Sequence, residues 1–419
     1  MKDKKILETT VKTLDRYQIC DCCVGRLFRQ IETGLTNKQK GRLIRNYIKY
    51  DKKTIAKDCW LCEGLLDEIE HFADLVSDVI KKYEFDTFLI GSKIDEDILD
   101  REKKLWDFIK SENVEPIKME INREVGKILE KKLGKTVDFE NPDIVAVIDT
   151  AFDAVNLQVS SIFIYGRYKK LKRGLPQTKW FCKICRGKGC KACSYTGKIY
   201  DTSVEELVSK KALEMTKGTD ESFHGSGRED IDALMLGNGR PFVLEIKNPQ
   251  IRNIDLSVIE KKTNEYGKDK IEIGDIRFSD RNEIVKIKGA GFRKTYRIVL
   301  EGEKPINKEK LKEVAQILQG RTIKQFTPTR VAHRRVNKVR ERKIYNCVIE
   351  SVEDTVAIVT VETESGTYLK ELISGDNGKT KPNISEMIGI PCIVKELDVI
   401  EIMGEYLDGK TIKRNKKQK

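Results

Sequence analysis

The sequence predicts a multidomain α+β protein. The chain has 419 residues, more than a single hydrophobic core normally serves, so two or three domains are expected. Hydrophobic residues make up 39% of it, a globular rather than a disordered composition. Helices and short apolar β runs alternate in the first half, and strands mix with helices from about residue 201 onward. We therefore predict three segments, at 1–75, 76–200 and 201–419.

The net charge and the cysteine content indicate the partners and the compartment. Lys and Arg exceed Asp and Glu by 80 − 67 = 13, which favours a polyanionic partner, although a solvated lysine-rich surface is the alternative. No apolar run approaches the roughly 18 residues that span a bilayer, and the N-terminus lacks an apolar signal core. We expect a cytoplasmic protein without membrane contact. Eleven cysteines in that compartment favour metal ligation over disulfides.

The elements before residue 201 follow from hydrophobic periodicity. Helices are predicted in the first segment and at 95–110 and 121–132, and strands at 85–91, 144–148 and 158–165. A basic stretch follows the last of these strands. Its cations are candidate phosphate contacts, with a solvated loop as the alternative, and they are Arg167, Lys169, Lys170, Lys172 and Arg173.

The segment from residue 201 reads as a mixture of helices and strands. Helices are predicted at 204–215, 255–264 and 308–319. Strands are predicted at 271–277, 293–300, 345–351, 356–362 and 393–402. Alternating apolar residues on both sides of Gly237-Asn238-Gly239 indicate a β-hairpin, with strands at 231–236 and 241–246.

Eight cysteines form two groups with metal-ligand spacing. Four thiolates within twelve residues can enclose one tetrahedral zinc, as in a zinc knuckle, and they are Cys182, Cys185, Cys190 and Cys193. Two distant pairs form the second candidate, Cys20 with Cys23 and Cys59 with Cys62, where Cys22 competes as a ligand. Four sulfurs leave no position for a reactive water, so about two structural zinc ions per chain are predicted.

A carboxylate follows a glycine loop in the third segment. Gly225 and Gly227 permit a tight backbone, and Arg228 and Asp230 come directly after them. Such a carboxylate suits catalysis, and on these features alone it equally suits a structural ion pair. The neighbouring carboxylates at 229 and 232 are rivals for the role. The chain has only three histidines, which argues against a histidine-centred mechanism.

Three motifs in this segment resemble those of RNA pseudouridine synthases. Gly227-Arg-Glu-Asp230 resembles their Gly-Arg-x-Asp motif, whose aspartate is the obligatory catalytic group. Lys294-Thr-Tyr296 resembles a Lys-x-Tyr motif whose tyrosine stacks on the uracil, and Gly366-Thr-Tyr-Leu-Lys370 resembles a motif whose basic residue pairs with that aspartate. The resemblance implies catalysis by Asp230. It also implies substrate contacts from Arg228, Tyr296, Tyr368, Leu369, Lys370 and, at an apolar pocket position of the last strand, Leu397.

A closer resemblance extends over essentially the whole chain. The segment 227–242, the segment 327–335 and the cysteine pairs together resemble the archaeal and eukaryotic tRNA pseudouridine(54/55) synthase family. This implies a C-terminal pseudouridine synthase fold behind a zinc-containing THUMP-type RNA-binding domain. It also implies isomerisation of uridines 54 and 55 in the TΨC arm of tRNA, without a catalytic or nucleotide cofactor. The density of basic residues around Arg330, Arg334 and Arg335 also suits a loop that binds RNA phosphates near the active site, with a solvated charged face as the alternative.

Two other functions are compatible with parts of this pattern. A catalytically inactive THUMP and zinc protein, or a chaperone, would bind tRNA with the same basic surface. A THUMP-linked methyltransferase would need a glycine-rich cofactor loop after a parallel strand. Gly237-Asn238-Gly239 is too short for that and lies in the predicted hairpin, so we reject the methyltransferase.

Overall fold

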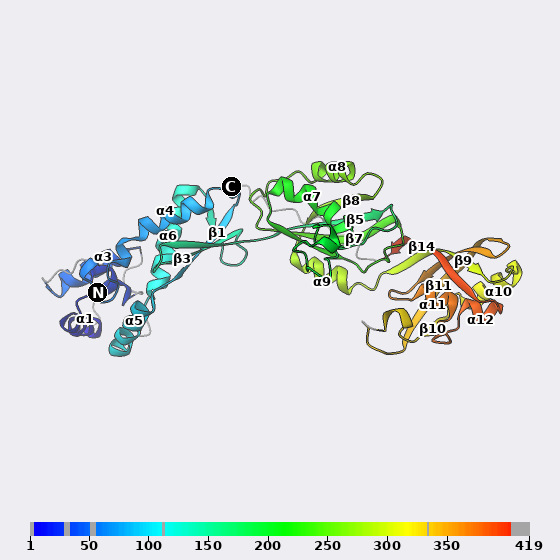
Figure 1. Ribbon diagram of the computed structural model, residues 1–419. Coiled ribbons are helices and arrows are strands. Elements are labelled where there is room, and N and C mark those ends of the chain that lie inside the picture. The colour runs from blue at the N-terminus through cyan, green and yellow to red at the C-terminus, as the bar shows by residue number, and fades with distance from the viewer. Residues whose placement is uncertain (1–3, 29–33, 51–55, 111–113, 333–334, 404–419) are drawn as a thin grey trace. The chain divides into compact units, whose positions relative to one another are not determined.

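The chain divides into two compact units in a computed structural model, which describes residues 4–28, 34–50, 56–110, 114–332 and 335–403. Unit 1 comprises residues 1–160 with 248–253, and unit 2 comprises 161–247 with 254–419 (Figure 1). Residues 161–200 lie in unit 2, and the predicted second segment, 76–200, therefore spans parts of both units. Within the described ranges, no helix combines the length and apolar character needed to cross a membrane.

Unit 1 is a small sheet with helices. Its helices are α1 (Lys4–Arg16), α2 (Asp21–Arg26), α3 (Asn37–Tyr47), α4 (Ile69–Ile80), α5 (Glu96–Ile109) and α6 (Ile117–Leu133). Its strands are β1 (Thr87–Lys93), β2 (Thr136–Val137), β3 (Ile144–Asp149) and β4 (Ala154–Val159), in the order β2-β1-β3-β4. Strand β1 is parallel to both of its neighbours, and β3 and β4 are antiparallel.

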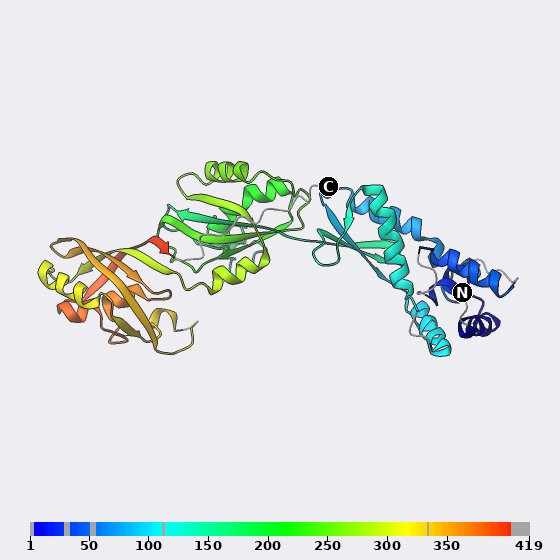
Figure 2. The same cartoon turned by 180° about the vertical axis from the view of Figure 1, so that it is seen from behind.

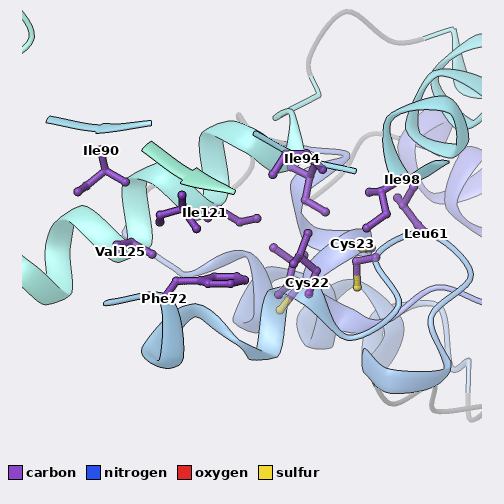
Figure 3. Close-up of a cluster of buried hydrophobic side chains, with 14 of the residues drawn as sticks. Cys22, Cys23, Leu61, Phe72, Ile90, Ile94, Ile98, Ile121 and Val125 are labelled. Carbon is purple, nitrogen blue, oxygen red and sulfur yellow. The ribbon is translucent and has the colours of Figure 1, made fainter. Parts of the chain in front are cut away.

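One apolar core holds unit 1 together. Helices α4 and α6 lie side by side on the sheet (Figure 1), and Figure 3 shows Phe72, Ile121 and Val125 from these helices below Ile90 of β1. The same cluster continues to Cys23 and its neighbours near α2. The predicted helices at 95–110 and 121–132 are confirmed as α5 and α6, although α6 starts four residues earlier, after Pro116.

Unit 2 contains the larger sheet. Its helices are α7 (Val204–Thr216), α8 (Leu256–Tyr266), α9 (Arg281–Gly289), α10 (Lys308–Leu318), α11 (Leu369–Ser374) and α12 (Ile384–Ile388). Its strands are β5 (Ile162–Lys170), β6 (Asp220–Gly225), β7 (Met235–Lys247), β8 (Ile271–Ser279), β9 (Arg293–Gly302), β10 (Thr322–Gln325), β11 (Arg340–Glu353), β12 (Val356–Thr363), β13 (Thr380–Lys381) and β14 (Cys392–Met403).

The sheet of unit 2 has the order β13-β10-β11-β12-β9-β14-β7-β5-β8, and β6 also pairs with β7. Strand β7 is antiparallel to β5 along one edge. Along its other edge it pairs with β6 over residues 242–247 and with β14 at Met235, where the two strands are parallel. The connection from β6 to β7, residues 226–234, begins where β6 leaves β7. We call these nine residues the catalytic loop, because they contain the predicted catalytic residue Asp230.

Helices cover both faces of the sheet around β5. Figures 1 and 2 show α7 and α8 on one face of the strands and α9 on the other. The alternation of β5 follows this arrangement: Ile162 and Ile164 pack in the core under α7 and α8, whereas Phe163 and Tyr165 pack with Ile287 of α9. Helices α10, α11 and α12 enclose a separate core on the other half of the sheet.

The predicted hairpin is wrong. Residues 235–247 form a single strand, and the reversal of the chain lies between β6 and β7 instead. Met235 and Arg240 face Lys170 and Tyr168 of β5, so the residues around Gly237-Asn238-Gly239 form a bulge rather than a turn. Gly237 has φ +58°, and a Cβ there would lie 1.7 Å from the carbonyl oxygen of Ile400. The close neighbouring strand explains the glycine.

The predicted strand at 158–165 is also wrong as a single element. Strand β4 ends at Val159, and β5 begins at Ile162 in the sheet of unit 2. The apolar run thus contributes to two different sheets. The five strands predicted after residue 270 are confirmed, each extended by a few residues, and so are the helices at 204–215, 255–264 and 308–319.

Candidate active site

A buried lysine holds the backbone of the catalytic loop. The ammonium of Lys170 donates to the carbonyl oxygens of Leu175 at 3.0 Å, Asp230 at 3.0 Å and Ile231 at 3.1 Å. Lys170 has no exposed surface, and its burial lowers its pKa. Its prediction as a phosphate contact is therefore wrong. Lys170 lies at the end of β5, and its side chain points towards the loop. There it donates to three carbonyl groups instead of to water.

A buried ion pair fixes the loop residue next to the candidate catalytic group. One carboxylate oxygen of Glu229 accepts from Arg240 Nε at 2.9 Å, and the hydroxyl of Tyr168 donates to the same carboxylate at 2.9 Å. Arg240 also donates to the carbonyl of Ser226 at 2.8 Å. Both charged side chains are at most 1% exposed. Glu229 is thus occupied by structural contacts, and burial raises the pKa of Tyr168 well above its ordinary value.

Asp230 lies on the open side of the loop between two cations. Its carboxylate is 3.6 Å from Lys370 Nζ and 3.7 Å from Arg330 Nη1, and 40% of the side chain is exposed. Both distances exceed those of charge-assisted hydrogen bonds. The cations can therefore stabilise the negative charge of Asp230 while its oxygens stay accessible to a substrate.

Other carboxylates share these two cations. Lys370 is 3.2 Å from Asp232, which is 69% exposed, and Arg330 binds Glu371 through both its Nε at 2.7 Å and its Nη2 at 3.3 Å. Arg330 lies in the short 3₁₀ helix η4 (Thr329–Val331) and was expected to contact phosphate. The structure places it at Asp230 instead. Arg335 is exposed, and Arg334 lies outside the described residues.

Tyr296 approaches the site from β9. It faces Val361 of β12 and Val399 of β14, so its position in the sheet is fixed on both sides. Burial raises the pKa of its hydroxyl to about 12, the charge of Asp230 adds to this rise, and Arg240 opposes it. The phenol is therefore neutral at physiological pH and offers an uncharged ring.

Lys294, two residues before Tyr296, is a second buried cation beneath the loop. Only 7% of it is exposed, and a Cβ placed on Gly227 would lie 3.0 Å from its Nζ. Burial lowers its pKa to about 7, and the charge of Arg240 acts in the same direction, while Glu229 opposes both. Lysine at this position thus titrates near neutrality.

Tyr368 and Leu369 enter the site at the start of α11. The side-chain amide of Gln325 holds the backbone of Tyr368 on both sides: it accepts from the backbone N–H at 2.8 Å and donates to the carbonyl at 2.8 Å. Leu369 is 3% exposed in the core of this half of the sheet, and Leu397 packs against the same core. No sequence signal pointed to Gln325.

Arg228 lies over an aromatic ring and does not pair with Asp230. Its guanidinium lies over the ring of Trp180, 5.3 Å from the ring centroid, and its side chain is exposed. Within the described residues, the cations paired with Asp230 are Lys370 and Arg330.

The basic stretch after 166 lies mostly in strand β5 rather than in an RNA-facing loop. Arg167 is 6% exposed and donates to the carbonyl oxygens of Gly239 and Ile402, so its prediction as a phosphate contact is wrong. Arg173 binds the carboxylate of Asp398 at 2.7 Å and the carbonyl of Asp232 at 2.7 Å, which supports the loop. Lys169 pairs with Glu272 at 3.1 Å, and Lys172 is exposed.

The eight predicted ligand cysteines meet in two groups of four. All sulfurs within each group lie within 4.8 Å of one another, and Cys22, although buried, is not among them. The distance is 3.8 Å between the sulfurs of Cys20 and Cys62, and 3.8 Å between those of Cys185 and Cys193. Four sulfurs at ~2.3 Å around a tetrahedral zinc lie about 3.8 Å apart. Both groups therefore fit such an ion.

Comparisons with known proteins identify the family of the chain. The family model "Pus10, C-terminal" matches residues 163–403, and "Pus10 THUMP domain, archaeal" matches residues 72–149. The chain is 38% identical to the tRNA pseudouridine synthase Pus10 of Methanothrix thermoacetophila, with 95% of each chain covered. It is 42% identical to that of Methanocaldococcus jannaschii, with 94% of each covered. A chain in the crystal structure of a Cbf5-Nop10-Gar1 complex is similar at a TM-score of 0.32 and 15% identity, over 57% of this chain and 48% of that one.

Each family match falls mainly in one of the two units. The THUMP match lies in unit 1, and the C-terminal match contains the catalytic loop together with Tyr296 and Lys370. The predicted α+β class, with a THUMP domain before a C-terminal synthase domain, is therefore confirmed. From a family model that covers more than half of the sequence and relatives that cover nearly all of it, the chain belongs to the Pus10 family.

Proposed function

We propose that the chain is a tRNA pseudouridine synthase that isomerises uridine in the TΨC arm, at positions 54 and 55, with Asp230 as its nucleophile or base. The observation that carries this proposal is the carboxylate of Asp230, which is partly exposed and lies 3.6 and 3.7 Å from two cations. The relatives that match the chain nearly end to end are named tRNA pseudouridine synthases, which supports the isomerase activity.

The reaction requires one accessible carboxylate and no co-reactant. The N1–C1′ bond of uridine breaks and a C1′–C5 bond forms, while C5 loses a proton and N1 gains one. Asp230 can attack carbon or remove the proton because its carboxylate is partly exposed beside Lys370 and Arg330. Glu229 is unsuited to this role because its oxygens are already bound by Arg240 and Tyr168.

The surroundings of Asp230 suit a uracil base turned out of the RNA. An extruded base needs a face on which to stack and apolar walls that reduce contact with water. Tyr296 supplies an uncharged ring, and Leu369 and Leu397 supply apolar surface. We assign Tyr296 to stacking and Lys370 to pairing with Asp230, as the resemblance to pseudouridine synthases implies.

The substrate proposal rests on the THUMP match and the basic charge. A THUMP domain ahead of the synthase domain suits tRNA, and the excess of 13 positive charges over the chain favours binding to its phosphates. The TΨC-arm positions come from the family resemblance. Reduced cysteine ligands suit a reducing compartment, and we propose the cytoplasm.

Replacement of Asp230 tests the activity. Asp230→Asn keeps the shape and removes the charge, so pseudouridine formation on transcribed tRNA is expected to fall more than a thousandfold, roughly as for other essential catalytic groups. The affinity for tRNA is expected to stay within about threefold, since one exposed carboxylate contributes little to phosphate binding. Asp232→Asn is the matched control and should retain activity. Pseudouridine mapping at positions 54 and 55 gives the readout.

Two results would contradict the proposal. If the wild-type protein leaves every uridine unchanged, the proposed activity is wrong. If Asp230→Asn keeps wild-type activity, the assignment of Asp230 as the catalytic residue is wrong. Full tRNA binding without any isomerisation would instead favour a THUMP and zinc protein that binds tRNA only.

We also propose that each four-cysteine group holds a structural zinc ion. Every ligand position would be filled by sulfur, so the ion would stabilise the fold and take no part in the reaction. Elemental analysis of the purified protein is expected to find about two zinc ions per chain. Cys23→Ser and Cys185→Ser should each remove one ion. Folded wild-type protein without bound metal would contradict this.

A further inference from the structure

The second four-cysteine group presents apolar side chains to solvent. Phe181 is 57% exposed, Ile184 is 74% exposed and Tyr195 is 69% exposed. Phe181 pairs with Lys198 in an isolated β-bridge, and a Cβ on Gly187 would lie 3.1 Å from its ring. One side of this ring therefore rests on the fold while the rest stays open. Three large apolar side chains with this exposure, within fifteen residues, indicate a binding surface.

The same segment is uniformly basic. Residues 180–200 contain no Asp or Glu and five cations, at Lys183, Arg186, Lys188, Lys191 and Lys198. Among the described residues, only Lys198 of these five has an acidic partner, Glu206 at 2.6 Å. A zinc ion with four thiolates would carry 2 − 4 = −2, and the four other cations carry +4. The net charge of +2, with cations on the outside, attracts an anion.

Aromatic contacts connect this segment to the catalytic loop. Trp180 packs edge-to-face on Tyr200, with ring centroids 5.6 Å apart, and the guanidinium of Arg228 lies over the ring of Trp180. Arg228 is two residues before Asp230 in the catalytic loop. The base of the cysteine segment therefore lies against the loop that carries the candidate catalytic carboxylate.

We propose that this segment binds the RNA substrate next to the uridine that reacts, with its rings stacked on unpaired bases and its cations on the adjacent phosphates. We call it the knuckle surface, and its residues are Phe181, Lys183, Ile184, Arg186, Lys188, Lys191 and Tyr195. The inference rests on the proposed function, because it deepens the account of the same substrate. Exposed rings between unpaired cations suit unpaired RNA, whose bases offer flat faces and whose backbone offers charge.

The rings and the cations can be tested separately. Phe181→Ala with Tyr195→Ala is expected to raise the Kd for tRNA about tenfold or more, with little change in its dependence on salt. Arg186→Ala with Lys188→Ala is expected to raise Kd as well and to reduce the slope of log Kd against log salt by about two, one for each phosphate contact. Both pairs of side chains are exposed, so metal content and thermal stability should stay at wild-type values.

Matched changes elsewhere in unit 2 serve as controls. Tyr266 on α8 is an exposed aromatic residue and Lys308 on α10 is an exposed lysine, so Tyr266→Ala and Lys308→Ala are expected to leave Kd unchanged. Equal losses in the controls and in the knuckle variants would overturn the inference. So would an unchanged Kd in both knuckle variants, which would assign the surface to another class of partner.

The binding measurement also separates this inference from the proposed function. At saturating tRNA, the single-turnover rate of both knuckle variants should stay close to that of wild type, because Asp230 and its cations are intact. If the wild-type protein isomerises uridine in tRNA but the knuckle variants bind tRNA with unchanged Kd, only the inference about the knuckle surface is contradicted. If the wild-type protein has no isomerase activity but the knuckle variants bind tRNA more weakly, only the proposed function is contradicted.

Discussion

Two sets of charged residues meet at the catalytic loop, one beneath it and one above it. Beneath the loop, Glu229, Arg240 and Lys170 are almost fully buried, and their contacts are 2.8–3.1 Å long. Above it, Asp230 and Lys370 are 40% and 31% exposed, and 3.6 Å separates their charged atoms. Neighbouring residues 229 and 230 thus belong to opposite environments.

The difference separates stability from chemistry within one loop. Buried charges with short contacts specify a backbone conformation, because an unpaired charge there is costly. Partly exposed charges at longer distances contribute little to folding but can stabilise a carboxylate that must reach a substrate. Mutations beneath the loop should therefore lower stability, and mutations above it should lower activity with little effect on stability.

The largest stability effect is expected for Glu229→Gln. It leaves Arg240 charged and buried without its counter-ion, so the free energy of unfolding should fall by about 3–5 kcal/mol in urea titrations. Asp230→Asn is the matched control, with an expected change of about 0.5 kcal/mol or less. The double change Glu229→Gln with Arg240→Met should recover part of the loss. If Glu229→Gln and Asp230→Asn destabilised the protein equally, the buried and the exposed charges would not differ in their contribution to stability.

A smaller effect is expected from the titration of Lys294. Its pKa is about 7 in the folded protein and 10.5 in the reference state, so between these pH values the unfolded chain holds the extra proton. The free energy of unfolding should consequently rise with pH, by up to about 1.4 kcal/mol for each pH unit, and by 2–3 kcal/mol between pH 7 and 9. Lys294→Met should lose this rise. Parallel stability curves for the two proteins would show that Lys294 does not titrate in this range.

A third and smaller loss of stability, with a clear effect on activity, is expected for Lys170→Met. Three carbonyl groups lose their donor, so stability should fall by roughly 1–2 kcal/mol, and the displaced loop should lower the single-turnover rate about tenfold. The affinity for tRNA should not change. Lys172→Met, an exposed change two residues later, is the control for both readouts. A weakened Kd with a reduced salt slope would restore Lys170 as a phosphate contact.

The sequence predicts the site best where the residues that act together lie close together in the chain. The cysteine groups followed from short intervals between thiols, and the order of Asp230, Tyr296 and Lys370 indicated a shared site before any geometry was known. Charge alone was a poor guide to exposure. The sequence predicts Arg167 and Lys170 as phosphate contacts because most of the carbonyl groups that bind them lie 60 residues or more along the chain, at 230–231, 239 and 402.

Long-range pairing also explains the errors in the strands. Gly237-Asn238-Gly239 has the composition of a tight turn, but strands β5 and β14 hold it as a bulge within β7. The sequence shows Arg330 as a basic residue but does not show that it contacts Asp230, which lies 100 residues earlier. No sequence motif distinguishes Gln325, or the pair of Glu229 with Arg240, from polar residues that lie in solvent.

The path of the chain between the units limits how the protein can be divided. Strand β5 follows unit 1 directly yet lies between β7 and β8, and residues 248–253 return to unit 1, where the backbone N–H of Glu84 donates to Gln250. A protease that cuts once near residue 160 should therefore leave the halves associated under native conditions. A fragment that starts at residue 201 would lack strand β5 and with it Lys170, which holds the catalytic loop. Such a fragment should aggregate. Deletion studies of tRNA binding need internal substitutions rather than truncation.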